Sequence, residues 1–337
     1  MNKLQILNKL NELAFSYFNA QTLSAACRLE VFTHLAESPM DADSLARKTD
    51  IHPDGCERLL EALRVLGLVE RENRQYRCSE VGLYMSEQAS APMRLIQSDN
   101  YFYRMWEYLP DALREFSPRF QQAWGVSAQE IYQSIYADPE RLQQFMQLMD
   151  SYNVCIGEEI AKHVDFSLSK VLLDVAGGSG SLAAEIGRVH EHLSGYILDL
   201  PPVYEYSYQN SQVLDRFKPV VGDMYRSDTY PPDCDVILLS WILHNWSDDS
   251  CLKILANCHE VLPPGGMLLI SEKVLDDERS GSWWGVMMSL QMLLACETGA
   301  KERTENEYRT LLSKAGFGDI FMVRLDAPRD IIVAYRQ

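Results

Sequence analysis

Hydrophobic residues recur at helical spacing through the first part of the chain. They are Leu4, Leu7, Leu10, Leu13, Phe15, Phe18, Leu23 and Ala26. A spacing of three to four residues places such side chains on one face of a helix, so the pattern predicts amphipathic helices. Charged residues lie among the apolar ones, and the segment is interpreted as helix rather than as a secretory signal peptide.

A pattern of two helices and two short strands follows. Residues 43–49 are predicted to form a helix that starts near an Asp or Ser, and residues 57–66 a second helix that ends at Gly67. Residues 68–78 read as two strands around the polar turn at Asn73. This order is that of a winged helix-turn-helix, so residues 1–100 are predicted to form one mainly helical domain.

Bulky side chains are frequent in the next segment, residues 101–160, which is predicted to be mostly helical. They are Tyr101, Phe102, Tyr103, Met105, Trp106, Trp124, Phe145, Met146 and Met149. Most are expected to lie in the core, but aromatic and methionine side chains at this density also line apolar ligand pockets. We therefore interpret the segment as a helical linker that contributes to a substrate pocket.

Strands and helices alternate from about residue 168. Strand-like runs lie at 171–175, 196–198, 236–239 and 267–270, helical stretches at 181–189 and 251–262, and a final helix with a hairpin at 305–315, 321–325 and 331–335. Such alternation is typical of a mostly parallel sheet covered by helices. Residues 161–337 are therefore predicted to form an α/β domain.

Net charge argues against two classes of partner. The 337 residues carry a net charge of −17, and an acidic surface repels phosphate backbones and anionic lipid heads. In the second helix of the winged domain, Glu57 and Glu61 offset Arg58 and Arg64, unlike a helix that reads DNA. We expect no nucleic-acid and no membrane partner, and interpret the winged domain as a packing module whose N-terminal helices face a partner.

The cysteine and apolar patterns predict a cytoplasmic protein without a metal. Eight cysteines show no C-x-x-C and no histidine cluster at metal-ligand spacing. They are interpreted as reduced thiols. No run reaches about 18 uninterrupted apolar residues, the length that spans a bilayer.

A glycine-rich turn between a strand and a helix carries the strongest chemical signal. Residues 174–180 read Asp-Val-Ala-Gly-Gly-Ser-Gly, and the glycines let the backbone turn sharply and approach a ligand. The helix that follows favours an anion such as an amino-acid carboxylate at its N-terminus. The next strand ends in Asp199, at the separation expected for an acid that binds ribose hydroxyls. The spacing differs from G-x-G-x-x-G, which argues against a dinucleotide.

These and further stretches resemble the small-molecule O-methyltransferases that depend on S-adenosyl-L-methionine, of the caffeic acid and hydroxyindole type with bacterial antibiotic-pathway relatives. The matching stretches are residues 174–180, 198–203, 222–225, 239–249, 262–266 and 301–304. The resemblance implies a Rossmann-like class I methyltransferase domain, the product S-adenosyl-L-homocysteine, and a winged-helix domain that forms a homodimer.

The resemblance also implies a cofactor site. Its residues would be Asp174, Gly177, Gly178, Gly180, Asp199, Leu200, Gly222, Asp223, Met224, Ser240 and Trp241. Asp199 would bind the ribose, while Asp223 and Met224 would hold the adenine. Ser240 stands where the plant enzymes often have lysine.

His244 falls where the family keeps its general base. A lone histidine after a strand would by itself be read as structural, but this one follows an apolar strand downstream of the cofactor turn. Glu272 and Glu302 match the two acids that bracket it in the family, and either can accept a hydrogen bond from the imidazole and fix its tautomer. Transfer of the proton while the O–C bond forms avoids full ionisation of a phenol whose pKa is about 10.

A substrate pocket is predicted beside the cofactor site. Its residues are Trp106, Phe145, Met149, Asn245, Met288, Met292 and Cys296. We expect an O-methyltransferase of secondary metabolism that acts on a hydroxyl of a small phenolic, quinone or polyketide acceptor. The alternatives are a C- or N-methyltransferase, a relative that binds the cofactor without methyl transfer, and, in another class, a ligand-sensing winged-helix regulator. Retention of His244 with both acids favours the first reading.

Overall fold

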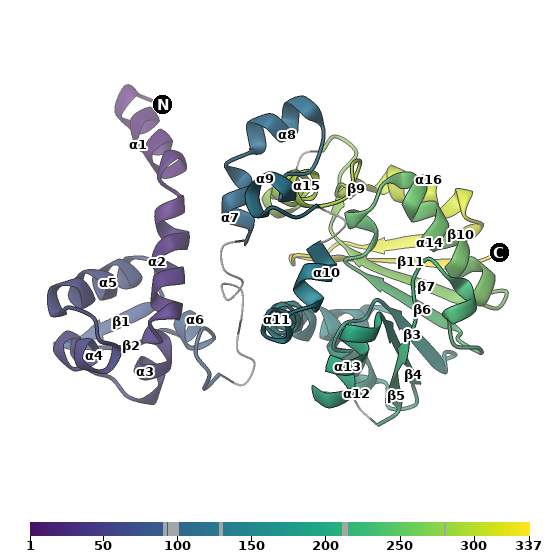
Figure 1. The fold of residues 1–337 in the computed structure, drawn as a ribbon, viewed down its shortest axis with the longest axis horizontal. Helices are drawn as coiled ribbons and strands as arrows, with labels where there is room; N and C mark the ends of the chain where they lie inside the picture. The colour runs from purple at the N-terminus through teal and green to yellow at the C-terminus, as the bar shows by residue number, and fades with distance from the viewer. Residues whose placement is uncertain (90–92, 94–100, 128–130, 211–214, 280) are drawn as a thin grey trace. The chain divides into compact units, whose positions relative to one another are not determined.

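Two units make up the chain in its computed structural model, Met1–Asp99 and Asn100–Gln337 (Figure 1). The structure describes residues 1–89, 93, 101–127, 131–210, 215–279 and 281–337. Among the helices in these ranges, none is long and apolar enough to cross a lipid bilayer.

The first unit has the predicted order of helix, turn, helix and wing. Its elements are α1 (Lys3–Ala14), α2 (Tyr17–Arg28), α3 (Val31–Glu37), α4 (Ala42–Thr49), α5 (Pro53–Val65), β1 (Val69–Glu72), β2 (Gln75–Cys78) and α6 (Glu80–Leu83). α5 begins four residues earlier than predicted, with a proline in its first turn, where the missing N–H costs nothing. β1 and β2 pair in antiparallel fashion around Asn73, whose φ of 57° is left-handed.

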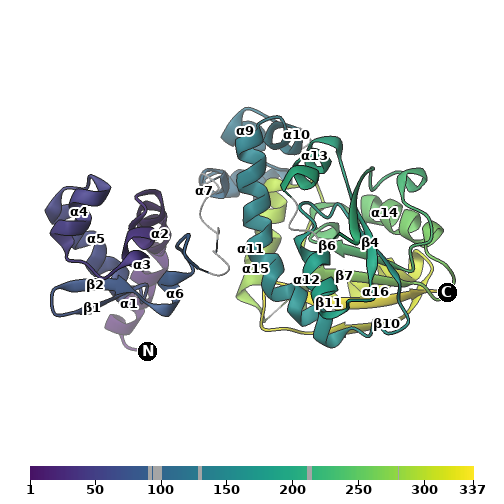
Figure 2. The ribbon, with the colours of Figure 1, turned by 90° about the horizontal axis from the view of Figure 1, so that it is seen from below.

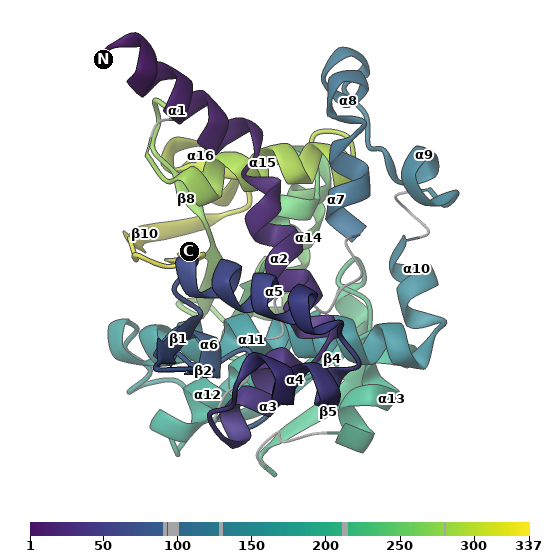
Figure 3. The ribbon, with the colours of Figure 1, turned by 90° about the vertical axis from the view of Figure 1, so that its left-hand side faces the viewer.

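Helix α1 buries none of its residues within this unit. Leu4, Leu10 and Leu13 are 64%, 57% and 61% exposed, and Figure 3 shows α1 extending beyond α2, away from the other helices of the unit. An exposed apolar surface of this kind is typical of a protein interface. The helix therefore lacks a packing partner within its own described unit.

A seven-stranded sheet forms the centre of the second unit. Its order is β10 (Phe317–Val323), β11 (Asp330–Arg336), β7 (Met267–Glu272), β6 (Val236–Ser240), β3 (Val171–Val175), β4 (Ser194–Asp199) and β5 (Phe217–Val221). Strands β3 to β7 of this sheet are parallel, and β11 and β10 add antiparallel to β7. The hydrophobic pattern does not predict β5. This strand lies at the sheet edge, where Pro219 is tolerated and a polar residue can face solvent.

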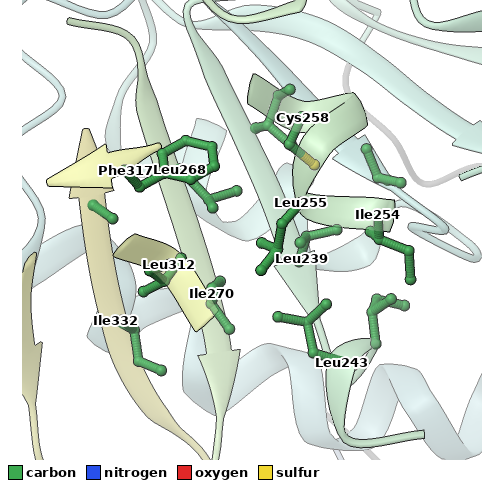
Figure 4. Close-up of a cluster of buried hydrophobic side chains, with 14 of the residues drawn as sticks. Leu239, Leu243, Ile254, Leu255, Cys258, Leu268, Ile270, Leu312, Phe317 and Ile332 are labelled. Atoms are coloured by element: carbon green, nitrogen blue, oxygen red, sulfur yellow. The ribbon is translucent and has the colours of Figure 1, made fainter. Parts of the chain in front are cut away.

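Helices cover both faces of this sheet. On one face α11 (Pro139–His163) and α12 (Ser181–Val189) pack against β3 and β6 (Figure 2). On the other face α14 (Asp248–Val261) and α16 (Glu305–Lys314) pack against β6 and β7 (Figure 4). Alternation along β6 sends Leu238 to the first face and Leu239 to the second. By the same alternation, Ser240 lies on the first face, which α11 covers.

Shorter elements surround this core. They are α7 (Tyr101–Trp106), α8 (Leu109–Glu115), α9 (Phe120–Trp124), α10 (Ile131–Tyr136), α13 (Pro201–Asn210), α15 (Trp283–Ala295), β8 (Val274–Leu275), β9 (Arg303–Thr304), and the 3₁₀ turns η1 (Ser227–Thr229) and η2 (Leu243–Asn245). Helices α7, α9 and α15 pack together around an apolar cluster that includes Met105, Phe120 and Met292.

We predict that Gly195→Ala destabilises the second unit. An added Cβ would lie 1.8 Å from the carbonyl oxygen of Leu172, so β3 and β4 would have to separate. The free energy of unfolding should fall by at least about 2 kcal/mol in urea denaturation. Gly125→Ala is the control, because its Cβ meets open space and only the positive φ of 75° is strained, at about 1 kcal/mol. Equal losses in the two variants would contradict this packing argument.

Candidate functional site

The carboxyl ends of the parallel strands meet at one edge of the sheet, and the predicted cofactor residues lie there. β3 leads into the glycine turn, β4 ends in Asp199 and β6 ends in Ser240. Open α/β sheets bind their ligands beyond this edge. The fold thus brings together three segments that are far apart in the sequence.

The glycine turn has the backbone geometry that its sequence predicts. Gly178 and Gly180 have φ of 59° and 79°, a region that glycine enters without strain. A Cβ on Gly177 would lie 2.6 Å from Cγ of Asp174. Gly180 caps the N-terminus of α12, so the unpaired N–H groups of that helix lie next to the turn.

Asp199 is held by the backbone on both sides. Its Oδ2 accepts the N–H of Gly178 at 2.9 Å, and its Oδ1 accepts the N–H of Leu200 at 2.8 Å. Burial raises the pKa of Asp199 to about 6, against the lowering effect of these two hydrogen bonds. The group is therefore largely ionised at neutral pH, and each oxygen keeps a lone pair for a ligand hydroxyl.

Asp174 is buried and incompletely paired. Its Oδ2 has no hydrogen-bond partner among the described residues. Burial raises the pKa of Asp174 to about 8, the charge of Asp199 adds to the rise, and Arg329 opposes it. An unpaired buried carboxyl oxygen is costly, which fits a group whose partner is a ligand.

The next loop along the edge follows β5. A Cβ on Gly222 would lie 2.6 Å from Cδ1 of Leu198, so a larger residue here would displace that side chain of β4. Asp223 Oδ1 accepts the N–H of Tyr225 at 2.9 Å. The carbonyl of Met224 accepts hydrogen bonds from Tyr230 and Asn257, at 3.0 and 2.9 Å. The loop is fixed by its own backbone, and the half-buried Asp223 and Met224 stay beside the edge.

An arginine that the sequence analysis missed lies at the end of β6. Arg329 donates to Ser240 Oγ at 2.6 Å, and its guanidinium carbon lies 4.5 Å from the ring centroid of Trp241. Its side chain is buried. No motif marks this residue, because it sits in the hairpin turn before β11, outside every matching stretch.

His244 lies on η2, just after β6, and is paired with Glu302. Its Nδ1 lies 2.8 Å from Oε1 of Glu302, and both side chains are buried. Since the carboxylate accepts, Nδ1 carries the hydrogen and Nε2 keeps its lone pair. Burial alone would lower the pKa of His244, but the charge and hydrogen bond of Glu302 raise it above the ordinary value. The ring lies parallel to Trp241 at a centroid distance of 6.1 Å.

Glu272 does not hydrogen-bond the imidazole, which corrects our expectation that either acid could do so. Its Oε1 accepts the backbone N–H groups of Ile242, Leu243 and His244, at 2.9, 2.6 and 3.2 Å. Its Oε2 accepts the hydroxyl of Tyr308. Glu272 therefore holds the turn that carries His244, while Glu302 holds its ring.

Arg303 is a second residue that the sequence analysis left without a role. It donates to the carbonyls of Leu243 and Trp246, at 2.8 and 2.7 Å, and pairs with Asp248. The side chain is buried. Arg303 thus binds the carbonyl side of the same turn whose N–H groups bind Glu272. Its position directly after Glu302 in a matching stretch was the available signal.

The pocket residues predicted on α15 form one group with Trp106 and Asn245. Met288, Met292 and Cys296 belong to the apolar cluster of α7, α9 and α15. Cys296 Sγ lies 3.2 Å from Oδ1 of Asn245. Trp106 Nε1 donates to Oε1 of Gln291 at 2.7 Å, so the buried Gln291, which the sequence analysis missed, also faces this group.

Of the two pocket residues predicted on α11, Phe145 belongs to a different cluster from that group. Phe145 packs in another cluster with Leu142, Met146 and Val203. Its ring meets the edge of Tyr132 at a centroid distance of 6.4 Å, and Tyr132 packs against the α15 group. Met149 is half-buried on the same helix. Among the described residues, Tyr132 therefore links Phe145 to the α15 group.

The fold and its edge define a class of protein. A mixed Rossmann-like sheet with a glycine turn after its first strand, and an acid at the end of the next, is the architecture of S-adenosylmethionine-dependent methyltransferases. The comparison with solved structures agrees. Human N-acetylserotonin methyltransferase in complex with SAM matches with a TM-score of 0.92 and 30% identity, over 100% of this chain and 98% of that one.

The comparisons with sequences name the family. An O-methyltransferase domain matches residues 106–318, and an O-methyltransferase dimerisation domain matches residues 11–88. Acetylserotonin O-methyltransferase of Homo sapiens is 31% identical, over 98% of each chain. The tetracenomycin polyketide synthesis 8-O-methyl transferase TcmO of Streptomyces glaucescens is 29% identical, over 96% of this chain and 94% of that protein. The chain belongs to the O-methyltransferase family and uses S-adenosyl-L-methionine.

We predict that Glu272→Ala destabilises the protein through the turn after β6. The variant leaves three buried N–H groups without an acceptor, and each such group costs about 1 to 3 kcal/mol. Urea denaturation should show a loss of about 3 kcal/mol or more. Glu278→Ala, at an exposed position near β8, should change the free energy of unfolding by less than about 0.5 kcal/mol. A Glu272→Ala variant as stable as the Glu278→Ala variant would show that this carboxylate does not hold the turn.

Proposed function

We propose that this O-methyltransferase methylates a hydroxyl group of a small aromatic acceptor, with His244 as the general base. The observation that carries the proposal is the buried pair of His244 and Glu302. Glu302 binds Nδ1 of the imidazole, so Nε2 is left to accept a proton. The turn that carries His244 lies next to both the cofactor edge and the apolar group of α15.

The cofactor side of the site is assigned as follows. When bound, S-adenosyl-L-methionine supplies an electrophilic methyl group on its sulfonium. Asp199 presents one lone pair on each oxygen to the ribose hydroxyls, because both oxygens are already oriented by backbone N–H groups. Asp223 and Met224 contact the adenine, and the glycine turn lies along the methionine part.

The proton moves to Nε2 of His244. An ordinary imidazole has a pKa of about 6.5 and a phenol about 10, so complete proton transfer before methylation would cost about 5 kcal/mol. Because Glu302 raises the pKa of His244, the difference from the phenol is smaller here. Glu302 also stabilises the imidazolium that forms, at the hydrogen bond to Nδ1.

The acceptor is assigned to an aromatic class from the side chains around His244. Met288, Met292 and Cys296 offer an apolar and polarisable surface, and the half-buried Trp106 and Asn245 add an aromatic face and an amide. A relative named for acetylserotonin, a compound with an aromatic indole ring, supports this class. Positioning of the hydroxyl against the methyl group contributes up to about 7 to 11 kcal/mol of barrier reduction.

The protein is further proposed to act as a homodimer. The matched dimerisation domain covers most of the first unit. Helix α1 at its start exposes leucines along one face, and a second copy of the same helix is the partner that twofold symmetry offers most simply.

We predict that His244→Gln lowers turnover by 10²-fold or more while affinity for S-adenosylmethionine stays within twofold, because the base acts on the acceptor alone. The acceptor for this assay is found by screening phenols, quinones and polyketides with labelled S-adenosylmethionine. The residual activity of the variant should rise as the pH approaches the pKa of the acceptor hydroxyl, since a phenolate needs no base. His163→Gln, at the exposed end of α11, is the matched control and should keep full activity. Full activity of His244→Gln at neutral pH would falsify the assignment.

We predict that kcat/KM falls on the acid side of its pH profile with a midpoint above pH 6.5. In Glu302→Gln this midpoint should move to lower pH. His244 must be unprotonated to act as a base. Burial lowers the pKa of His244 and the charge of Glu302 raises it. When Glu302 is replaced by a neutral residue, the lowering effect of burial dominates. Glu302→Gln should lower the rate, because a neutral glutamine stabilises the imidazolium less well. The loss should be smaller than in His244→Gln, because the base itself is still present. An unshifted limb would show that a group other than His244 titrates.

We predict that Leu7→Arg with Leu10→Arg separates the homodimer. Two charges on the exposed apolar face of α1 would be buried in the interface without partners, which costs several kcal/mol. Light scattering should give twice the 38.5 kDa of one chain for the wild type and a single chain for the variant. Asn8→Arg, on the opposite face of α1, should remain dimeric. A wild-type monomer at micromolar concentration would contradict the proposal.

A further inference from the structure

Arg329 is a buried cation that forms no ion pair with any residue that the structure describes. Its side chain is 2% exposed, and it makes no ion pair with a carboxylate in the described part of the chain. Its hydrogen bonds go to neutral oxygens, Ser240 Oγ at 2.6 Å and Asn153 Oδ1 at 2.9 Å. A buried charge with no directly bonded counter-ion is costly. The described residues supply none at ion-pair distance, so a ligand anion would complete the compensation that the charge of Asp174 gives only in part.

The position of Arg329 is fixed by the residue that follows it. Asp330 is fully buried and accepts from Lys273 Nζ and from the N–H groups of Val274 and Leu325, at 3.1, 3.0 and 2.7 Å. These contacts tie the turn before β11 to the end of β7. The guanidinium is therefore held at the sheet edge before any ligand arrives.

Its surroundings are those of the amino-acid end of a ligand. Asn153 also donates to Ser181 Oγ at 2.8 Å, and Ser181 opens α12 directly after the glycine turn. Asp174, with its unpaired Oδ2, is the carboxylate whose charge acts most strongly on Arg329. A fixed cation and a neighbouring acid with a free oxygen are complementary to a carboxylate and an ammonium on one carbon.

We propose that Arg329 binds the carboxylate of the methionine part of S-adenosyl-L-methionine. Its guanidinium then gains the anion that it lacks, and a planar fork of N–H donors matches a carboxylate in geometry. The adjacent Asp174 faces the ammonium of the same amino acid. Burial lowers the pKa of Arg329 to about 9, partly offset by Asp174, so the group is a cation at neutral pH.

A purely structural role does not require the charge. Glutamine at this position could donate to an oxygen such as that of Ser240 or Asn153 without the cost of a buried charge. The stacking on Trp241 likewise works for a neutral planar group. What the guanidinium adds over an amide is its positive charge and its fork, and both act on an anion.

The experiment compares two ligands on two proteins by isothermal titration calorimetry, without acceptor. The ligands are S-adenosyl-L-homocysteine and its decarboxylated analogue, S-adenosyl-3-thiopropylamine, which keeps the amine, thioether and nucleoside. Arg329→Gln should weaken binding of S-adenosyl-L-homocysteine by about 10- to 100-fold, the effect of a hydrogen bond to a charged group. Binding of the decarboxylated analogue should change by less than threefold. A double-mutant cycle of this form isolates the contact between arginine and carboxylate.

Two further variants keep the test informative. Arg329→Lys retains the charge but cannot reproduce the fork, so it should lose part of the affinity for S-adenosyl-L-homocysteine only. Arg309→Gln is the control, because Arg309 on α16 is already paired with Glu305 and donates to the carbonyl of Ile320 on β10; it should leave both affinities within twofold. Circular dichroism and thermal unfolding verify that each variant is folded.

An equal loss of affinity for the two ligands in Arg329→Gln would overturn the proposal. It would show that Arg329 supports the structure of the site without binding the carboxylate. Should Arg329→Gln fail to fold, the wild type decides alone. It must bind the decarboxylated analogue at least tenfold more weakly than S-adenosyl-L-homocysteine, and a difference below threefold would overturn the proposal. Since neither measurement involves an acceptor, the result is independent of the assignment of His244.

Discussion

The geometry of the site depends on one buried carboxylate at the end of β7. Glu272 accepts three successive N–H groups of the turn after β6, which would otherwise be buried without acceptors. Because Ser240 and Ser271 are register partners in the parallel pair of β6 and β7, the pairing of the two strands determines where the turn begins. Tyr308 on α16 holds the second oxygen of Glu272. The position of His244 thus follows from sheet register and helix packing together.

Charge burial is concentrated at the same edge of the sheet. Asp174, Asp199 and Arg329 lie on the side of the glycine turn, and His244 with Glu302 on the side of α15. Each of these groups loses hydration on folding, and each is compensated by a different means. Asp199 is stabilised by backbone N–H groups, and Glu302 by an imidazole. Among the described residues, Asp174 and Glu302 each keep one oxygen without a hydrogen-bond partner, and Arg329 has no ion pair. Asp174 and Arg329 lie next to the turn that the cofactor requires.

The hydrophobic pattern predicted most elements, and its errors have physical causes. Helix α14 begins at Asp248 rather than at Cys251, because its first turn consists of acidic residues that follow the Ser247 cap and carry no apolar period. β5 was not predicted, because only Phe217 of this edge strand is buried. The start of α14 is set by a side-chain cap and β5 by backbone pairing with β4, and neither leaves a periodic pattern of apolar residues.

The sequence by itself determined the order of strands and helices, the glycine turn and the acids that follow the strands, because these depend on neighbouring residues and on local backbone conformation. Only the tertiary structure decided which acid reaches the imidazole and which cation reaches the end of β6. His244 and Glu302 are 58 residues apart, and Ser240 and Arg329 are 89 apart. Such contacts are made by the antiparallel addition of β11 to β7 and by the docking of β9 beside β8. No local pattern encodes them, because the energy that selects them is that of long-range pairing and of burying charge in one shared interior.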